Sequence, residues 1–207
     1  MTPDIEYRSA GTVRSVGGTL RIGGHAAVFG AVSQNLGGFV EQVGREAFDT
    51  SAAEGWPDVV CRYNHSDDFL LGSTAGGTLR LAIDRVGLDY EVDLPQCRAD
   101  VGELVARGDV AKSSFAFRTI DDDWSNTGGR VLRTLLNVHL IDTAPVTTPA
   151  YPDATAGLRS LARRFDAPYQ DVLDLNKQQR LDKMFVRTDR RAPLSGQMAL
   201  AQTLRRR

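Results

Sequence analysis

The chain of 207 residues has few cysteines, few histidines and no long apolar run. Cys61 and Cys97 are its only cysteines, and neither belongs to a Cys-x-x-Cys pair of the kind that binds zinc or forms a redox dithiol. No apolar stretch approaches the ~20 residues of a membrane-spanning helix. The first residues do not begin a signal peptide. These absences predict a soluble protein of a reducing cytosol, with both thiols free.

The sequence also lacks the motifs of metal- and phosphate-dependent chemistry. Its three histidines, His25, His65 and His139, are scattered rather than clustered at the spacing of metal ligands. It contains no Gly-x-x-x-x-Gly-Lys-Ser/Thr loop for a nucleotide phosphate. The acidic run at 121–123 is not followed by the glutamate of a calcium loop. We therefore expect neither a bound metal nor a cofactor.

Charge is almost balanced over the whole chain but unevenly placed along it. The formal net charge is −1, which gives no reason to expect binding to nucleic acid or membranes. Residues 1–152 carry 13 Lys and Arg against 20 Asp and Glu, whereas residues 153–207 carry 12 against 6. This contrast predicts a main domain over 1–152 and a basic C-terminal extension over 153–207, partly helical or disordered.

Most of the main domain has the pattern of short strands separated by turns. Residues 88–94 alternate strictly between apolar and acidic side chains, as in a strand with one buried face. Residues 131–142 predict a longer strand with apolar even positions, after a polar stretch at 121–129 that we expect to be a hairpin loop. Only residues 99–107 have convincing helical spacing, with Gly108 as the C-terminal stop. The pattern predicts a mainly β fold with small helices (α+β), either a barrel or a sandwich.

The stretch at 110–118 carries the first candidate catalytic residue. Phe115 and Phe117 alternate, so in a strand they share one face and can anchor it in the core. Ser114 then lies on the opposite face, held in a fixed position and open to a base and a substrate, as a nucleophile requires. The alternative is a half-buried strand with an incidental hydroxyl. Arg118, on the same face as Ser114, is a further candidate for polarising a carbonyl.

A serine nucleophile needs a base and a group that orients the base. His65 is the candidate base, because it ends a predicted strand beside a polar turn. Asp142 and His139 compete for the third role, and their spacing places them on opposite faces of a regular strand. Asp142 continues the apolar face, where an unpaired acid costs free energy, so we expect it to orient His65. His139 shares a solvated face with Arg133 and is the alternative.

A series of short motifs runs in order through most of residues 20–152. The motifs lie at 24–29, 38–41, 44–48, 63–65 (Tyr-Asn-His), 71–79, 84–88, 94–95, 108–110, 113–117 (Ser-Ser-Phe-Ala-Phe) and 142–151. In their order and spacing the chain resembles the prohead proteases of tailed bacteriophages. These are capsid-maturation serine proteases, distantly related in fold to the herpesvirus assemblins.

This resemblance implies a fold, an activity and a set of residues. The fold is an antiparallel β-barrel core of the assemblin type, and the activity is that of a serine endopeptidase. The family's histidine in its Asn-His pair falls on His65, and its serine before Phe-x-Phe falls on Ser114. Its acidic residue, usually glutamate, falls on Asp142. The related viral enzymes use a second histidine in that role, which keeps His139 as the alternative.

The resemblance also implies the substrates and the setting. These are scaffolding or propeptide segments of the major capsid protein, and the protease itself, inside an assembling procapsid in the host cytoplasm. The expected partners are the capsid protein and further copies of this chain, as substrates or in a homo-oligomer, with no nucleic acid and no membrane. The alternative is a non-catalytic assembly or scaffolding protein of the same fold. An unrelated esterase is disfavoured, because the chain lacks the usual Gly-x-Ser-x-Gly elbow.

Overall fold

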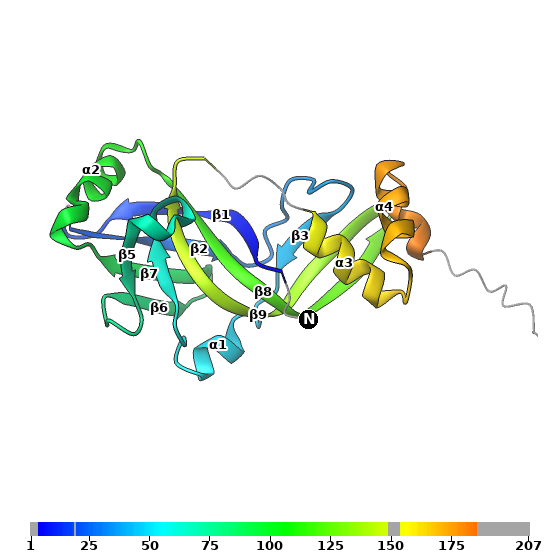
Figure 1. Ribbon diagram of the computed structural model, residues 1–207, viewed down its shortest axis with the longest axis horizontal. Coiled ribbons are helices and arrows are strands. Elements are labelled where there is room, and N and C mark those ends of the chain that lie inside the picture. Colours follow the sequence, from blue (N-terminus) through cyan, green and yellow to red (C-terminus); the bar gives the residue numbers. More distant parts are fainter. Residues whose placement is uncertain (1–3, 19, 149–153, 186–207) are drawn as a thin grey trace, which may run out of the picture.

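The computed structural model describes residues 4–18, 20–148 and 154–185 (Figure 1). Its strands are β1 (Glu6–Ser15), β2 (Arg21–Val28), β3 (Val40–Val43), β4 (Val60–Arg62), β5 (Leu70–Ser73), β6 (Leu79–Ile83), β7 (Gly87–Asp93), β8 (Lys112–Thr127) and β9 (Arg130–Val146). Its helices are α1 (Asp49–Ala53), α2 (Ala99–Arg107), α3 (Thr155–Arg164), α4 (Tyr169–Lys177) and the short 3₁₀ helices η1 (Tyr63–His65), η2 (Asp67–Phe69), η3 (Gln96–Arg98) and η4 (Leu181–Phe185). Within the described ranges, no helix has the length and apolar character needed to cross a membrane.

The strands form one curved sheet of nine strands in the order β5-β4-β9-β8-β1-β2-β7-β6, with β3 pairing β9 outside this path. The two ends of the sheet approach each other, since a Cβ added to Gly72 of β5 would lie 2.6 Å from Val92 Cγ2 of β7. The result is a nearly closed barrel with α2 at one end (Figure 1). The prediction of a mainly β, barrel-type fold with small helices is confirmed. β3 and β4 depart from the antiparallel pattern, because both pair with β9 in parallel.

The barrel interior holds β8 in place through apolar and polar contacts. The rings of Phe115 and Phe117 are fully buried and stack with centroids 4.9 Å apart, on one face of the strand as their alternation predicts. On the same face, Ser113 Oγ lies 2.9 Å from the hydroxyl of the buried Tyr90 on β7. Both polar groups thereby find a partner inside the core. The opposite face of β8 carries Ser114.

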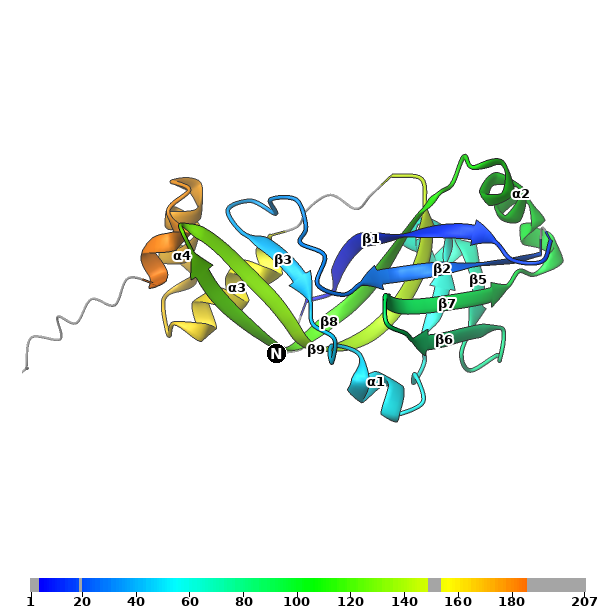
Figure 2. The ribbon, with the colours of Figure 1, turned by 180° about the vertical axis from the view of Figure 1, so that it is seen from behind.

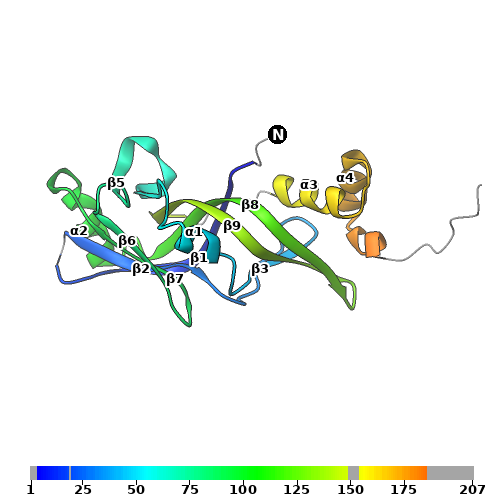
Figure 3. The ribbon, with the colours of Figure 1, turned by 90° about the horizontal axis from the view of Figure 1, so that it is seen from below.

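The hairpin of β8 and β9 extends beyond the barrel and carries a second core (Figures 2 and 3). The expectation of a polar loop at 121–129 is wrong, because β8 runs to Thr127 and β9 begins at Arg130. Gly128 and Gly129 make the tight turn between them with positive φ angles of 61° and 84°, which glycine adopts without strain. α3, α4 and η4 pack on this hairpin, and the buried residues of their core are Leu36, Phe39, Trp124, Val131, Leu158, Leu161, Ala162, Val172 and Leu181.

The second core combines residues from before and after position 152. The helices over 155–185 therefore do not form a separate body, and the division of the chain into 1–152 and 153–207 stays a prediction. The basic runs at 187–191 and 205–207 lie outside the described residues.

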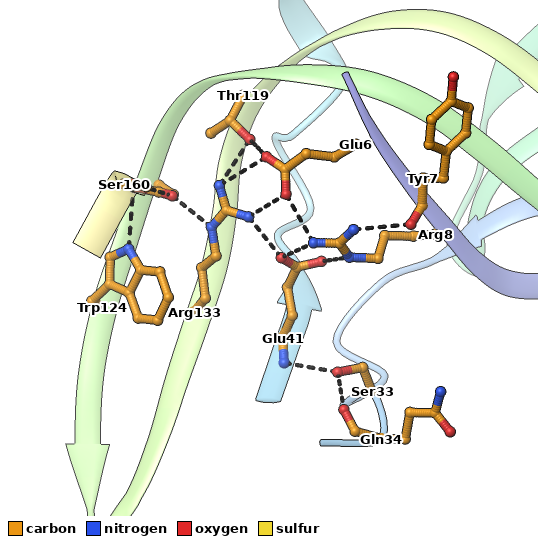
Figure 4. A network of polar contacts seen from close by, with 11 residues as sticks. Glu6, Tyr7, Arg8, Ser33, Gln34, Glu41, Thr119, Trp124, Arg133 and Ser160 are labelled. Carbon is orange, nitrogen blue, oxygen red and sulfur yellow. Dashed lines mark hydrogen bonds and ion pairs between the residues drawn. The ribbon is translucent and has the colours of Figure 1, made fainter. Parts of the chain in front are cut away.

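A buried ionic network ties the hairpin to β1 and β3 (Figure 4). Arg133 of β9, which we expected on a solvated face, is fully buried and lies 2.7 Å from Glu6, 2.9 Å from Glu41 and 2.6 Å from Asp122. Arg8 lies 2.8 Å from Glu6 and 2.7 Å from Glu41. Burial alone would raise the pKa of Glu6, but the guanidinium groups of Arg133 and Arg8 more than offset this and hold that pKa below its ordinary value. The charges of this network therefore stabilise one another.

Gly157 allows α3 to approach the hairpin closely. A Cβ at this position would lie 2.6 Å from Phe39 Cζ, inside the second core. Gly157→Ala is therefore expected to lower the free energy of unfolding by about 1–3 kcal/mol, as overpacking does, despite the better helix propensity of alanine. Urea unfolding followed by circular dichroism measures this difference. A variant as stable as the wild type would mean that the Phe39 ring moves aside freely.

Candidate active site

Three separate segments of the chain, β8, β9 and η1, lie close together on the outer face of the barrel. Ala116 of β8 lies opposite Asp142 of β9, and Ser114 precedes Ala116 by two residues. Because alternate residues of a strand share one face, Ser114 lies on the same face as Asp142. β4 pairs with the other edge of β9, with Val60 opposite Asp142. η1 follows β4 directly and brings His65 over this face.

The three candidate residues form one hydrogen-bonded chain. His65 Nε2 lies 2.7 Å from Ser114 Oγ, and His65 Nδ1 lies 2.9 Å from Asp142 Oδ2. Ser114 and Asp142 are fully buried, and 11% of the His65 side chain is exposed. When Nδ1–H donates to the carboxylate, Nε2 is left to accept the serine proton. This is the arrangement that activates a serine for nucleophilic attack.

The backbone that carries the imidazole adopts a conformation that is uncommon outside glycine. Asn64 and His65 both have left-handed φ angles, of 54° and 56°. Asn64 Oδ1 accepts a hydrogen bond from the N–H of Thr147, just beyond β9, at 2.9 Å. The ring of Tyr7 on β1 packs edge-on against the imidazole with centroids 4.8 Å apart. The position of His65 is therefore fixed from β1, from the end of β9 and from its own turn.

A β-bulge in β9 decides which of its side chains face Ser114. Asp142 pairs with Ala116 and His139 pairs with Arg118, so β9 advances by three residues where β8 advances by two. Ala116 and Arg118 share a face of β8, and the expectation that Asp142 and His139 face opposite sides is therefore wrong. Within the described part of the chain, Asp142 forms a hydrogen bond with the imidazole, whereas no side-chain hydrogen bond or ion pair joins His139 or Arg118 to Ser114, His65 or Asp142.

Arg62, the last residue of β4, is a neighbour of Asp142 that the sequence analysis missed. Its Nε donates to Asp142 Oδ2 at 2.8 Å, and its Nη1 pairs with Asp67. Burial opposes the charge of Arg62, but the carboxylates of Asp142 and Asp67 raise its pKa above the already high ordinary value, so it is a cation. The sequence feature that indicates a cation near Asp142 is the buried position of this acid, because a buried carboxylate needs a cation or several hydrogen-bond donors.

The other nucleophilic side chain near the site is inert. Cys61 of β4 is fully buried, and burial raises the pKa of its thiol above the ordinary value. Since the thiolate is the reactive form, Cys61 does not compete with Ser114 as a nucleophile. Among the residues that the structure describes, no three or more His, Cys, Asp or Glu side chains are grouped so that they could hold a metal ion.

A cavity of about 340 Å³ has Tyr7 in its wall, but none of Ser114, His65 and Asp142 lines it. Its wall is mainly apolar, with Val28, Val32 and Phe115 among the lining residues, and Arg8 and Glu41 supply charged groups. Tyr7 lines this cavity and also contacts His65. The cavity is therefore connected to His65 through Tyr7, and its wall suits an apolar side chain.

Comparison with known protein families shows to which family the chain belongs. The family model described as caudovirus prohead serine protease matches residues 5–167 of the chain. The matched residues include Ser114, His65 and Asp142 and extend through α3. No curated protein and no solved structure gives a significant match.

Proposed function

Because the chain belongs to the caudovirus prohead serine protease family, we propose that it matures a phage capsid by using Ser114 as nucleophile, His65 as base and Asp142 as the group that orients the base. Family membership makes the chain a serine protease of prohead maturation. The roles of the three residues and the identity of the substrates are the parts that the proposal adds.

The observation that carries the residue assignment is the unbroken chain of contacts from Ser114 Oγ through both ring nitrogens of His65 to Asp142 Oδ2, at 2.7 and 2.9 Å. These side chains come from β8, η1 and β9, and a purely structural serine would need neither a base nor an acid beyond it. A non-catalytic assembly protein of the same fold, the alternative that the sequence left open, does not require these hydrogen bonds between a serine, a histidine and an acid.

In the proposed reaction, His65 Nε2 takes the hydroxyl proton while Ser114 Oγ attacks the carbon of the scissile carbonyl. Asp142 accepts the Nδ1–H hydrogen bond throughout and stabilises the positive imidazole that forms. When the tetrahedral intermediate collapses, the C–N bond breaks and Nε2–H is donated to the leaving amine. A water molecule then gives a proton to Nε2 and attacks the acyl carbon. When this second intermediate collapses, the bond between the acyl carbon and Ser114 Oγ breaks, Nε2–H donates its proton to Oγ, and the product acid leaves.

We further propose that the substrates are scaffolding or propeptide segments of the major capsid protein and the protease chain itself. Cleavage then takes place inside the assembling procapsid, in the host cytoplasm. Support for this part comes from the family alone. The cavity beside Tyr7 is the candidate place for an apolar side chain of the substrate.

The substrate proposal is tested by following intact masses over time. Purified wild-type protein is incubated alone and with its capsid protein, and the same mixtures are made with Ser114→Ala. We expect fragments of the capsid protein, and of the protease itself, that form only with the wild type. Their masses locate the cleavage sites. Full-length masses in every mixture would contradict the proposal.

Asp142→Asn is expected to lower kcat by about 10⁴-fold, by analogy with the same change in other serine proteases. The asparagine amide donates a hydrogen bond to Nδ1, so the proton moves to Nε2 and the base is lost. The measurement is the cleavage rate of a peptide that spans a mapped cleavage site.

His139→Gln is the matched control for the third role, because His139 lies on the same strand and face but forms no side-chain hydrogen bond with His65. We expect its rate to stay within a few-fold of the wild type. A large loss in H139Q together with a small loss in D142N would assign the third role to His139 instead.

A further inference from the structure

The proposed mechanism leaves one charged side chain of the site without a role. We propose that Arg62 is a positioning residue, which fixes the orientation of the Asp142 carboxylate and, through it, the orientation of the His65 imidazole. This inference rests on the proposed function of Ser114, His65 and Asp142. It concerns a residue that touches only the acid of the three, not the substrate or the reacting atoms.

Arg62 contacts the carboxylate of Asp142 directly. Arg62 Nε and His65 Nδ1 donate to the same oxygen, Asp142 Oδ2, at 2.8 and 2.9 Å. The second oxygen, Oδ1, is buried and has no hydrogen-bond partner among the described residues. Nothing in these contacts therefore fixes the carboxylate except the two donors at Oδ2. Without Arg62 the carboxylate can rotate about its Cβ–Cγ bond, and the bond that orients the imidazole weakens.

Burial makes the charge of Arg62 as important as its geometry. Asp142 is fully buried, and 17% of the Arg62 side chain is exposed. A buried carboxylate without a cation attracts a proton to itself or to its neighbour, because few water molecules can stabilise its charge. With Arg62 in place the two opposite charges form a pair that is neutral overall, so the charge of the buried carboxylate is compensated.

Few ionisable groups face the side chains of Asp142 and His65. The elements packed around these two residues supply the following groups: Arg62 and Cys61 of β4, Asp67 of η2, Tyr7 of β1, Tyr90 of β7, and, further along the same face, Arg118 of β8 and His139 of β9. Burial raises the pKa of both the Cys61 thiol and the Tyr90 phenol, so these groups stay neutral. Among the described residues, Arg62 is the cation in hydrogen-bond contact with Asp142.

The experiment is the pH profile of kcat/KM for Arg62→Met and Arg62→Lys, on a peptide that the wild type cleaves. In R62M we expect the acidic limb to move up by about one pH unit, because removal of a nearby cation favours the protonated imidazole. R62K keeps the charge but not the Nε contact, so it should return the limb toward its wild-type position. Arg98→Met is the matched control, since Arg98 stacks on Phe69 and donates to the backbone oxygen of Asp68 without contacting Asp142. We expect no movement of the limb in R98M.

A second variant tests the same idea with the opposite sign. Asp67 is 89% exposed and pairs with the outer side of the Arg62 guanidinium. Asp67→Asn removes one of the two carboxylates that share the Arg62 charge, so the acidic limb should move to lower pH. D67N changes only a surface position and keeps the proposal testable if R62M does not fold.

A readout that needs no catalysis separates this inference from the proposed function. In the Ser114→Ala background, the imidazole of His65 is titrated by NMR with and without R62M. We expect the midpoint to rise in S114A/R62M. An unchanged midpoint, or an acidic limb of folded R62M that coincides with the wild type, overturns the role of Arg62. If the wild type cleaves nothing, the proposed function fails, and the NMR titration still decides the role of Arg62.

Discussion

Ser114→Ala is expected to lower kcat for peptide cleavage by about 10⁶-fold, the size of effect seen when a serine protease loses its nucleophile. The change removes the atom that forms the acyl intermediate, so His65 and Asp142 have nothing left to activate. Because the three residues act as a unit, adding His65→Ala to S114A should cost little further activity. The measurement is single-turnover cleavage of a peptide at a mapped site, followed by mass spectrometry.

Ser113→Ala is the matched control for S114A, because it changes the neighbouring serine of the same strand. Ser113 faces the core and contacts the Tyr90 hydroxyl at 2.9 Å, not His65. We expect S113A to keep its cleavage rate and to lose about 1 kcal/mol of stability, since the buried phenol loses its partner. If S113A is inactive and S114A is not, the nucleophile has been assigned to the wrong residue.

Arg133→Met is expected to lower the free energy of unfolding by about 3–5 kcal/mol, the cost of removing one partner from a buried ionic network. Methionine keeps much of the side-chain volume, so the loss is mainly electrostatic. Arg133 is fully buried between Glu6, Glu41 and Asp122. Its removal leaves the buried Glu6 and Glu41 with Arg8 as their cation, and leaves Asp122 with the hydroxyl of Ser160. The measurement is urea unfolding, with circular dichroism as the probe.

The comparison for R133M is a surface ion pair of the same barrel. Arg21 lies 2.5 Å from Asp93, and 48% of its side chain is exposed. Arg21→Met should change stability by no more than about 1 kcal/mol, because solvent screens such pairs. Equal losses in R133M and R21M would mean that the network in Figure 4 contributes no more than an ordinary surface contact.

Local patterns predicted the parts of the fold that depend on neighbouring residues. The alternation at 88–94 corresponds to β7, and the helical spacing at 99–107 corresponds to α2, with Gly108 in the left-handed conformation at φ 85°. Phe115 and Phe117 face the core, with Ser114 on the other side of β8. In each case the sequence pattern and the element that it predicts lie in the same short segment of the chain.

The register of β9 could not be predicted in the same way. Its buried positions change from odd (Val131, Leu135) to even (Val138, Leu140), because the pairing with β8 is irregular between them. A second irregularity then turns Asp142 to the face opposite Leu140. Asp142 was thus expected at the site, but on the wrong face of the strand. Bulges of this kind depend on the partner strand and leave no period in the sequence.

The surroundings of charged residues could not be predicted where their partners are distant in sequence. Asp122 belongs to a run that reads as a solvated loop, yet it pairs with Arg133 and accepts a hydrogen bond from Ser160 of α3. Arg62 reaches Asp142 only because β4 pairs in parallel with β9. Such partners become visible only when the strand order is known.

The strand order also determines when activity can first arise during synthesis. His65 and Asp142 are 77 positions apart, and Glu6 and Arg133 are 127 apart, so the proposed catalytic contacts and the buried ionic network both depend on long-range pairings. Such contacts form slowly, because large loops must close before the contacts can offset the lost chain entropy. β9 completes both sets, and it leaves the ribosome after every other strand of the sheet. If Ser114, His65 and Asp142 act as proposed, cleavage can begin only after β9 has paired with β8 and β4.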